Sequence, residues 1–378
     1  MVNDIQFGGN CRCTDIFPMF RIGTVQQSWT TFGVVMDEIR LGEMQSDDGD
    51  VPTVAVHPAD DPVGNPTAED RRSNNMDTPD ENMSILALPD FDGADKTFTL
   101  PSQSKLFDLG QIDVQWDAEL GTLWAFITPL DRPNYNLGLL RDTMAWQMEA
   151  KKVFAADPDR LRYMVLGSRF PGVFNLGGDL EMFARCIENQ DRETLRQYSH
   201  LCVDIVDRVW HNNDMPVINI GLAQGDALGG GFEALMCFDV IIAERQARFG
   251  LPEVLFGLFP GMGAYSILAR RLGHSVAEKM ILSGKVYTAE EMHEMGIVTV
   301  LADPGQGEEI ARDYILSNRD RHAGQLGVFR AGRRVMPLDL AELRDIVDGW
   351  VDTAMKLTER DIKMMRRLAA AQTRLHRR

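Results

Sequence analysis

The sequence has few cysteines, a shortage of basic residues and no long apolar run. Its five cysteines are an odd number and are scattered along the chain, which argues against a disulfide framework and favours a reducing compartment. No apolar stretch approaches the ~18 residues that a membrane-spanning helix requires. The first four residues include Asp4 and no basic residue, so no secretory signal is visible. We therefore predict a cytoplasmic protein without a membrane span.

The charge balance is strongly acidic. The 378 residues include 39 Lys and Arg against 56 Asp and Glu, a net charge of −17. This argues against sequence-independent binding of nucleic acid, which depends on basic residues that neutralise phosphates. The acidity is concentrated in residues 1–100, which hold 18 acidic and 6 basic residues. With 44% apolar and 25% charged residues, the chain as a whole has the composition of a globular protein.

Composition and patterning divide the chain into four parts. Residues 1–45 form an N-terminal extension without firm periodicity. Residues 46–104 are rich in Asp, Pro, Asn and Gly, and we predict a disordered linker because such a segment cannot bury enough apolar surface. Residues 105–305 form the predicted catalytic core. Residues 306–378 are predicted to be helical and to cover the pocket or form an oligomer contact.

The core alternates between strand and helix patterns, which predicts an α/β fold with a parallel sheet and helical crossovers. Strands are expected at 111–116, 120–128, 162–166, 216–221 and 240–243, and helices at 136–152, 180–187, 192–210 and from about 232. A loop is expected through Pro252 and Glu253, with helices from Met262 onward. Near the C-terminus, apolar residues recur every three or four positions from Leu343 to Leu357, which predicts an amphipathic helix.

Two glycine-rich turns are the first candidate functional features. In residues 221–233, GLAQGDALGGGFE, a predicted strand leads into a glycine run and then a helix. Glycines permit close backbone approach to a ligand, and a helix start exposes free N–H groups to an anion. The segment matches neither a phosphate-binding P-loop nor the dinucleotide pattern, and glycines required only for packing would also explain it.

A second turn of the same kind lies in residues 173–180, VFNLGGDL, between the strand at 162–166 and a helix. Two strand–turn–helix units at the same edge of a parallel sheet could direct two backbone N–H groups at one oxygen. That is the geometry of an oxyanion hole, in which loss of one donor costs about 3 kcal/mol of transition-state stabilisation.

Two carboxylates accompany these turns. Glu233 lies one turn into the helix that follows the glycine run, and Glu253 follows Pro252 twenty residues later. Two carboxylates in a site of low dielectric can divide acid and base roles, because environment and mutual repulsion separate their pKa values. An exposed helical glutamate at 233 and a helix N-terminal charge at 253 are the alternative interpretations.

These segments resemble the crotonase (enoyl-CoA hydratase/isomerase) superfamily. The resemblance runs from about Lys105 to the C-terminus and rests on LGGGFEALMCFDVIIAE, FGLPEVLFGLFPGMGAYSILARRLG and MGIV in that order. It implies a spiral of ββα units with a C-terminal helical region. Within the superfamily, VFNLGGDL, QGDALGGGFEA and WVDTAMKL look most like the diffusible signal factor synthases, which make cis-2-unsaturated fatty acids for bacterial quorum sensing.

The resemblance implies roles for individual residues. Gly178 and Gly230 would hold the thioester oxygen through their backbone N–H groups, and Glu233 and Glu253 would be the acid/base pair. The implied reaction is dehydration of a 3-hydroxyacyl thioester, with proton loss at C2 and departure of the C3 hydroxyl, for which we favour Glu253 as proton donor. Hydrolysis of the thioester would follow in the same oxyanion hole and release a fatty acid.

The thioester carrier is acyl carrier protein or coenzyme A, and we expect no other cofactor. Coenzyme A hydratases usually carry a basic residue just after the first oxyanion turn, whereas residues 179–182 here, Asp-Leu-Glu-Met, contain none. This favours acyl carrier protein, although an acidic carrier would need a basic dock such as Arg270–Arg271 or Arg330 with Arg333–Arg334. We assign no metal, because no second Cys/His pair accompanies Cys11 and Cys13.

An apolar pocket for the acyl chain is also expected. Met262, Trp350 and Leu368 are the candidates for its lining, and ordinary packing in the core or at a subunit interface is the alternative. The resemblance further implies a homotrimer or hexamer and regulation by a sensor kinase. Two other functions stay open: a general enoyl-CoA hydratase of fatty acid metabolism, and a crotonase-fold scaffold that acts by binding a partner.

Overall fold

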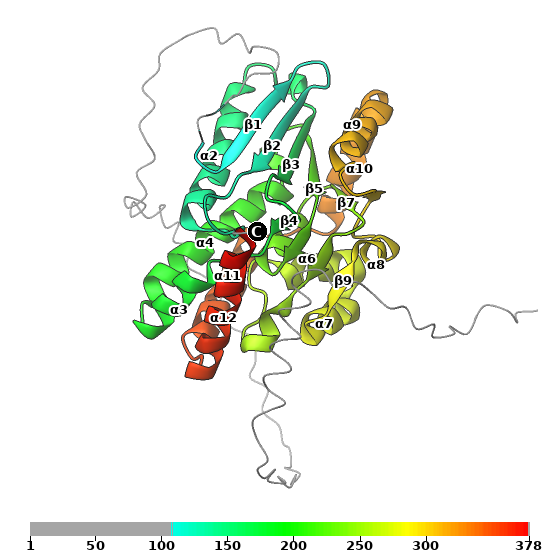
Figure 1. The fold of residues 1–378 in the computed structure, drawn as a ribbon. Helices are drawn as coiled ribbons and strands as arrows, with labels where there is room; N and C mark the ends of the chain where they lie inside the picture. Colours follow the sequence, from blue (N-terminus) through cyan, green and yellow to red (C-terminus); the bar gives the residue numbers. More distant parts are fainter. Residues whose placement is uncertain (1–106, 108, 377–378) are drawn as a thin grey trace, which may run out of the picture. The chain divides into compact units, whose positions relative to one another are not determined.

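The computed structural model describes residue 107 and residues 109–376 (Figure 1). The predicted segments 1–45 and 46–104 lie outside the described residues. The larger sheet has six strands in the order β1-β2-β3-β5-β7-β10. Its strands are β1 (Ile112–Asp117), β2 (Thr122–Ile127), β3 (Tyr163–Ser168), β5 (Ile218–Ala223), β7 (Val240–Glu244) and β10 (Val300–Ala302). β1 and β2, which correspond to the predicted strands 111–116 and 120–128, form an antiparallel hairpin, and the remaining pairs in this sheet are parallel.

A second, smaller sheet lies beside the first in the order β4-β6-β8-β9. Its three-residue strands are β4 (Val173–Asn175), β6 (Asp226–Leu228), β8 (Arg248–Gly250) and β9 (Val286–Thr288). Our sequence prediction missed these strands and β10, and it placed β8 in a loop. The alternation that identifies a strand needs four or more residues, so a three-residue strand carries too little pattern to be detected.

Helices connect the strands and cover both faces of the larger sheet. They are α2 (Leu137–Val153), α3 (Leu180–Glu188), α4 (Arg192–Trp210), α5 (Gly230–Leu235), α6 (Ala264–Leu272), α7 (His274–Ser283), α8 (Ala289–Glu294), α9 (Gly307–Asn318), α10 (His322–Val335), α11 (Leu340–Ala354) and α12 (Glu359–His376). In Figure 1, α9 and α10 lie on one side of the sheet, and α2 and α4 lie on the other. Because both faces are covered, strands such as β3 and β5 are buried at every position.

The predicted elements of the core are confirmed, with boundaries shifted by a residue or two. Short 3₁₀ turns add η1 (Pro158–Arg160), η2 (Asn212–Asp214), η3 (Pro252–Phe256) and η4 (Arg319–Arg321). η3 replaces the loop that we expected at Glu253, because Pro252 occupies the first position of the turn and fixes its backbone. Asp179 and Asp191 cap α3 and α4 by accepting backbone hydrogen bonds in the first turn.

The C-terminal helices pack on α3 and α4. The predicted stripe of α11 turns Leu343, Val347 and Trp350 inward, where all three side chains are buried. Ion pairs join α4 to α11, among them Arg192–Asp352 and Arg196–Asp348. The fold class, a parallel α/β core followed by a helical region, is thus confirmed.

Candidate active site

The two glycine-rich turns meet at one end of the smaller sheet. β4 and β6 are parallel neighbours, and each ends in a turn that leads into a helix, α3 or α5. A Cβ atom placed on Gly230 would lie only 3.4 Å from Gly177 Cα, so the two turns are in backbone contact. Gly177 and Gly229 adopt φ values of 88° and 53°, a region that favours glycine. Side chains at this contact would hold the two turns apart.

The backbone amides of Gly178 and Gly230 donate to no acceptor within residues 109–376. The neighbouring Gly177 amide, by contrast, donates a hydrogen bond to Asn175 Oδ1 at 2.8 Å. Gly230 is the first residue of α5, where amides have no intrahelical partner. The structure therefore brings together two turns that each present an uncommitted donor. The donors follow strands of the smaller sheet, and not the strand at 162–166 from which we expected the first turn to begin.

Glu233 is buried beneath this contact, with 2% of its surface exposed. Its Oε1 accepts hydrogen bonds from the amides of Met262 at 2.8 Å and Ala264 at 3.0 Å. These amides come from the Pro-Gly-x-Gly turn before α6, in which Gly263 has φ 112°. Burial raises the pKa of the Glu233 carboxyl, and the two amide donors oppose the increase. The alternative of an exposed helical glutamate is excluded.

Glu253 lies in η3 against the second glycine turn. A Cβ atom on Gly229 would lie 2.7 Å from Glu253 Oε1, so the missing side chain makes room for this carboxyl. Glu253 Oε2 is buried and has no hydrogen-bond partner among the residues that the structure describes. Burial, followed by repulsion from Glu233, raises the pKa of Glu253 well above its usual range. The two glutamates are thus electrostatically coupled, and they titrate as a pair.

Two polar residues at the first turn, Tyr198 and Asn175, were missed by the sequence analysis. The Tyr198 hydroxyl, on α4, donates to the Tyr135 carbonyl and accepts from the Asp179 amide at 3.4 Å. Asn175 Nδ2 is buried without a partner in the described part of the chain, while its Oδ1 accepts from the Gly177 amide and orients the turn. These side chains hold the backbone that carries Gly178. No sequence signal marks them, because Tyr198 falls on the buried face of a helix and Asn175 on a short strand.

A narrow cavity of about 30 Å³ lies behind Glu233 between α2 and α4. Met262, one of the three residues predicted to line an acyl pocket, lines this cavity. Trp350 and Leu368 do not line it: the Trp350 ring stacks edge-on against Phe183 at 5.2 Å, and Leu368 is buried on α12. Trp350 also contacts the backbone at Gly261, where a Cβ would lie 2.6 Å from the indole Cγ. It supports the turn that holds Glu233.

The expected basic docks are partly occupied by internal contacts. Arg270 pairs with Glu342, and Arg271 donates to the Phe238 carbonyl at 2.6 Å. Arg333 pairs with Asp239. Arg330 and Arg334 line a surface pocket of about 380 Å³ together with Arg333 and His211.

The first oxyanion turn does have a cation nearby. Arg132 Nη2 lies 3.8 Å from Asp179 Oδ1, although it is 47 residues away in the sequence. Among the described residues there is no cluster of three or more His, Cys, Asp or Glu side chains that could hold a metal ion. The same part of the chain contains no helix long and apolar enough to cross a membrane.

Comparison with known proteins agrees with this geometry. Residues 127–314 match the sequence family described as enoyl-CoA hydratase/isomerase. This segment belongs to the crotonase superfamily. Among solved structures, the fold is similar to an enoyl-CoA hydratase from Bacillus halodurans, with a TM-score of 0.58 and 19% identity over 68% of this chain and 99% of that one. At this identity the likeness supports the crotonase fold alone.

Two curated relatives are similar in sequence to this chain. The fatty acid oxidation complex subunit alpha of Vibrio vulnificus is 30% identical over 223 residues, or 58% of this chain and 29% of the relative. The peroxisomal fatty acid beta-oxidation multifunctional protein AIM1 of Arabidopsis thaliana is 32% identical over 145 residues, or 38% of this chain and 19% of the relative. The chain therefore spans less than a third of the length of either relative.

Proposed function

We propose that this chain catalyses the reversible addition of water to a 2-enoyl thioester, which is also the dehydration of a 3-hydroxyacyl thioester. The observation that carries the proposal is the coupled, buried pair Glu233 and Glu253 beside the uncommitted amides of Gly178 and Gly230. The curated relatives, whose names place them in fatty acid oxidation, support a fatty acyl thioester as the substrate.

The two amides would hold the thioester oxygen and stabilise the enolate formed when C2 loses its proton. Hydrogen-bond donors fixed in a site of low dielectric are effective because they need no reorganisation as the charge develops. The absence of side chains on both glycines allows a carbonyl oxygen to approach the backbone. No nucleophilic serine or cysteine is required for this step.

Different surroundings favour different roles for the two glutamates. Glu233 accepts two amide hydrogen bonds, which stabilise its carboxylate and suit it to accept the proton from C2. Glu253 has an unpartnered buried oxygen and a raised pKa, so it is held protonated and suits the donation of a proton to the departing C3 hydroxyl. In hydration, the same proton transfers run in the opposite direction.

The specific reaction that we propose is the synthesis of a cis-2-unsaturated fatty acid signal. In this reaction, dehydration of a 3-hydroxyacyl thioester is followed by attack of water on the thioester carbonyl, and the same two amides would stabilise the tetrahedral oxyanion. The motifs VFNLGGDL, QGDALGGGFEA and WVDTAMKL support this assignment through their likeness to diffusible signal factor synthases. A homotrimer or hexamer and a sensor-kinase regulator belong to the same proposal.

Acyl carrier protein is the carrier that we propose for this signal synthesis, with coenzyme A as the alternative. The lack of a basic residue in 179–182 supports the carrier protein, whereas Arg132 beside Asp179 supplies a positive charge that could serve a nucleotide. The exposed Arg330 and Arg334 are the remaining basic side chains of the predicted docks that have room for an acidic partner.

The decisive experiment incubates the purified full-length chain with 3-hydroxyacyl and 2-enoyl thioesters of both carriers and identifies the products by mass spectrometry. Free 2-enoic acid from the carrier-protein substrate supports signal synthesis. Interconversion of the coenzyme A esters without release of acid supports a general hydratase and excludes the signal synthase. If neither thioester is converted, the proposed activity is wrong and a partner-binding role takes its place.

A further inference from the structure

The cavity behind Glu233 has an unusual lining for a fatty acyl pocket. It adjoins the active site, because two of its lining residues are Ala234, which follows Glu233, and Met262, whose amide binds the Glu233 carboxylate. Most of its lining is apolar, from α2, α4 and neighbouring segments: Leu140, Leu166, Ile205, Val206, Val209 and Phe238. Its volume of about 30 Å³ has room for roughly two water-sized groups, so it would receive only the end of a chain.

Two of the residues that line this space carry polar groups without partners among the described residues. Gln147 on α2 is 1% exposed, and neither its Oε1 nor its Nε2 has a hydrogen-bond partner within residues 109–376. The adjacent Trp146 is also buried, and its indole Nε1 has no acceptor in the same part of the chain. Thr143, one turn away, donates its hydroxyl to the Leu139 carbonyl at 2.7 Å and so keeps only acceptor capacity.

These groups would discriminate between the ends of acyl chains. A methyl-ended chain would exclude water from the cavity and leave the Gln147 amide and the Trp146 N–H unpaired, which is unfavourable for buried polar groups. A hydroxyl could donate to Gln147 Oε1 and accept from Gln147 Nε2 or Trp146 Nε1. Sites that hydrogen-bond a substrate hydroxyl reject the analogue that lacks it far more strongly than an apolar pocket rejects an extra methylene.

We propose that Gln147, with Trp146, makes this cavity a binding site for a hydroxyl group on the acyl chain, beyond the carbons that react. The chain preferred by this site is therefore short and hydroxylated at its distal end. The inference rests on the proposed function, because that function places the thioester group at the two glutamates and the acyl chain toward the cavity. The preference for a hydroxyl group is a property of binding, so it can be measured without catalysis.

The test measures dissociation constants by calorimetry for saturated acyl-CoA thioesters of increasing length, each with a methyl or a hydroxyl end. The full-length wild type should bind the hydroxyl-ended thioester of one length at least about tenfold more tightly than its methyl-ended counterpart. Gln147→Leu and the closer isostere Gln147→Met should abolish or reverse that preference. Gln115→Leu, a change of an exposed glutamine on β1, is the matched control and should retain it.

Three results separate this inference from the proposed function. A wild type without hydroxyl preference at any length, or a preference that survives both Gln147 substitutions, overturns the inference and indicates that buried water satisfies the amide. Hydratase activity in that same protein would leave the proposed function standing. Selective binding of the hydroxyl-ended thioester without conversion of any 2-enoyl thioester would instead support the pocket and refute the activity.

Discussion

At the scale of single residues, the protonation of two carboxyl groups controls the proposed chemistry. Burial and mutual repulsion raise the pKa values of Glu233 and Glu253, so the pair titrates as a unit. When the pair carries one proton, the ionised group can accept a proton while the protonated group donates one. Activity then requires an intermediate protonation state, which is lost when both groups are protonated and also when both are ionised.

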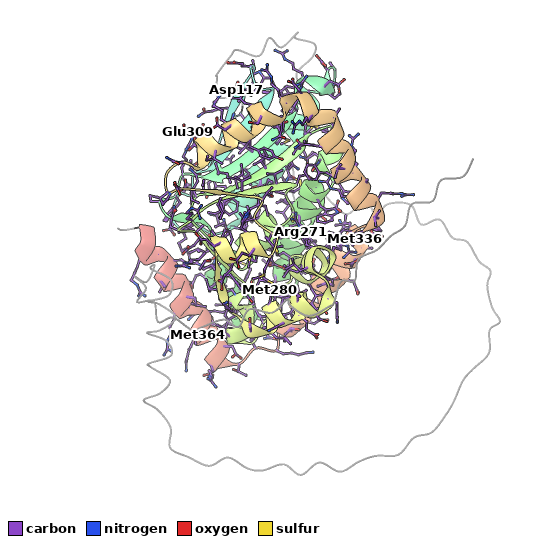
Figure 2. All side chains as sticks on the ribbon, turned by 90° about the vertical axis from the view of Figure 1, so that its right-hand side faces the viewer. Asp117, Arg271, Met280, Glu309, Met336 and Met364 are labelled. Carbon is purple, nitrogen blue, oxygen red and sulfur yellow. The ribbon has the colours of Figure 1, made fainter. Side chains whose placement is uncertain are left out.

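We predict a bell-shaped pH dependence of kcat/KM for hydration, and loss of about 10²–10⁴-fold in kcat for Glu233→Gln and for Glu253→Gln. A glutamine oxygen at 233 can still accept the Met262 and Ala264 hydrogen bonds, so the fold should persist and the loss should reflect proton transfer. Steady-state rates across the pH range check this. Glu309→Gln, on the exposed surface of α9 (Figure 2), is the matched control, and full activity in either active-site variant would contradict the assignment.

Substitution by alanine should have different effects on stability at two adjacent glycines of the second turn, Gly230 and Gly231. A Cβ atom on Gly231 would lie 2.0 Å from the Asn175 carbonyl oxygen, which is backbone and cannot move away cheaply. On Gly230 the closest atom, at 2.4 Å, is the flexible Met262 Cε. We expect Gly231→Ala to lower the free energy of unfolding by about 1–3 kcal/mol and Gly230→Ala to lower it less while reducing activity. Urea denaturation and hydration rates measure both effects, and equal stability losses would contradict this view of the turn.

At the scale of elements, the smaller sheet connects the site to the core. β4 and β6 deliver the two oxyanion turns, and η3 and the turn before α6 position the glutamates. The sheet also carries Asp226 on β6, whose Oδ1 accepts from the Arg248 amide of β8 at 3.0 Å. Burial raises the pKa of Asp226 to about 7. An ionisable group therefore lies within the support of the active site.

The Asp226 carboxyl should make the free energy of unfolding decrease as the pH rises. The native state keeps the Asp226 proton up to about pH 7, whereas the unfolded chain releases it near 3.8, so between these values the unfolded state binds fewer protons. We expect this group to lower the free energy of unfolding by roughly 1.4 kcal/mol per pH unit in that window. Urea denaturation of wild type and Asp226→Asn across the window measures the difference. A decline of the same steepness in both proteins would refute the burial argument.

At the scale of the whole molecule, an acidic N-terminal sequence precedes a core with the crotonase fold. Within the described part of the chain, the residues of the proposed site come from residues 132–264. The helices α11 and α12 contribute through packing, since Trp350 supports the turn at Gly261.

We predict that limited proteolysis of the full-length chain begins between residues 46 and 104. This segment has the composition of a disordered linker and contains Arg71, Arg72 and Lys96 as trypsin sites, whereas many later basic residues lie in packed helices or ion pairs. Mass spectrometry of the early tryptic fragments locates the first cuts. Initial cleavage inside the core helices, with the segment 46–104 intact, would contradict the predicted domain division.

Sequence alone was sufficient for features that depend on local pattern. The long helices, the six-residue strands and the amphipathic α11 follow from repeated apolar spacing, and the two Gly-Gly turns and both glutamates follow from motifs of contiguous residues. Their contact could be predicted in outline, because parallel strands place their carboxyl ends at one edge of a sheet. The three-residue strands that actually bring the turns together were too short to be recognised.

Contacts between segments that are distant in the sequence became known only from the tertiary structure. Arg132 lies beside Asp179, Tyr198 holds the first turn through Tyr135, and Trp350 packs under Gly261 and not in the cavity. The raised pKa values and the unpartnered Gln147 amide arise from burial, which is a property of packing between elements and leaves no mark in local sequence. The motifs thus determined which groups could react, and the packing determined their charge and the space open to a substrate.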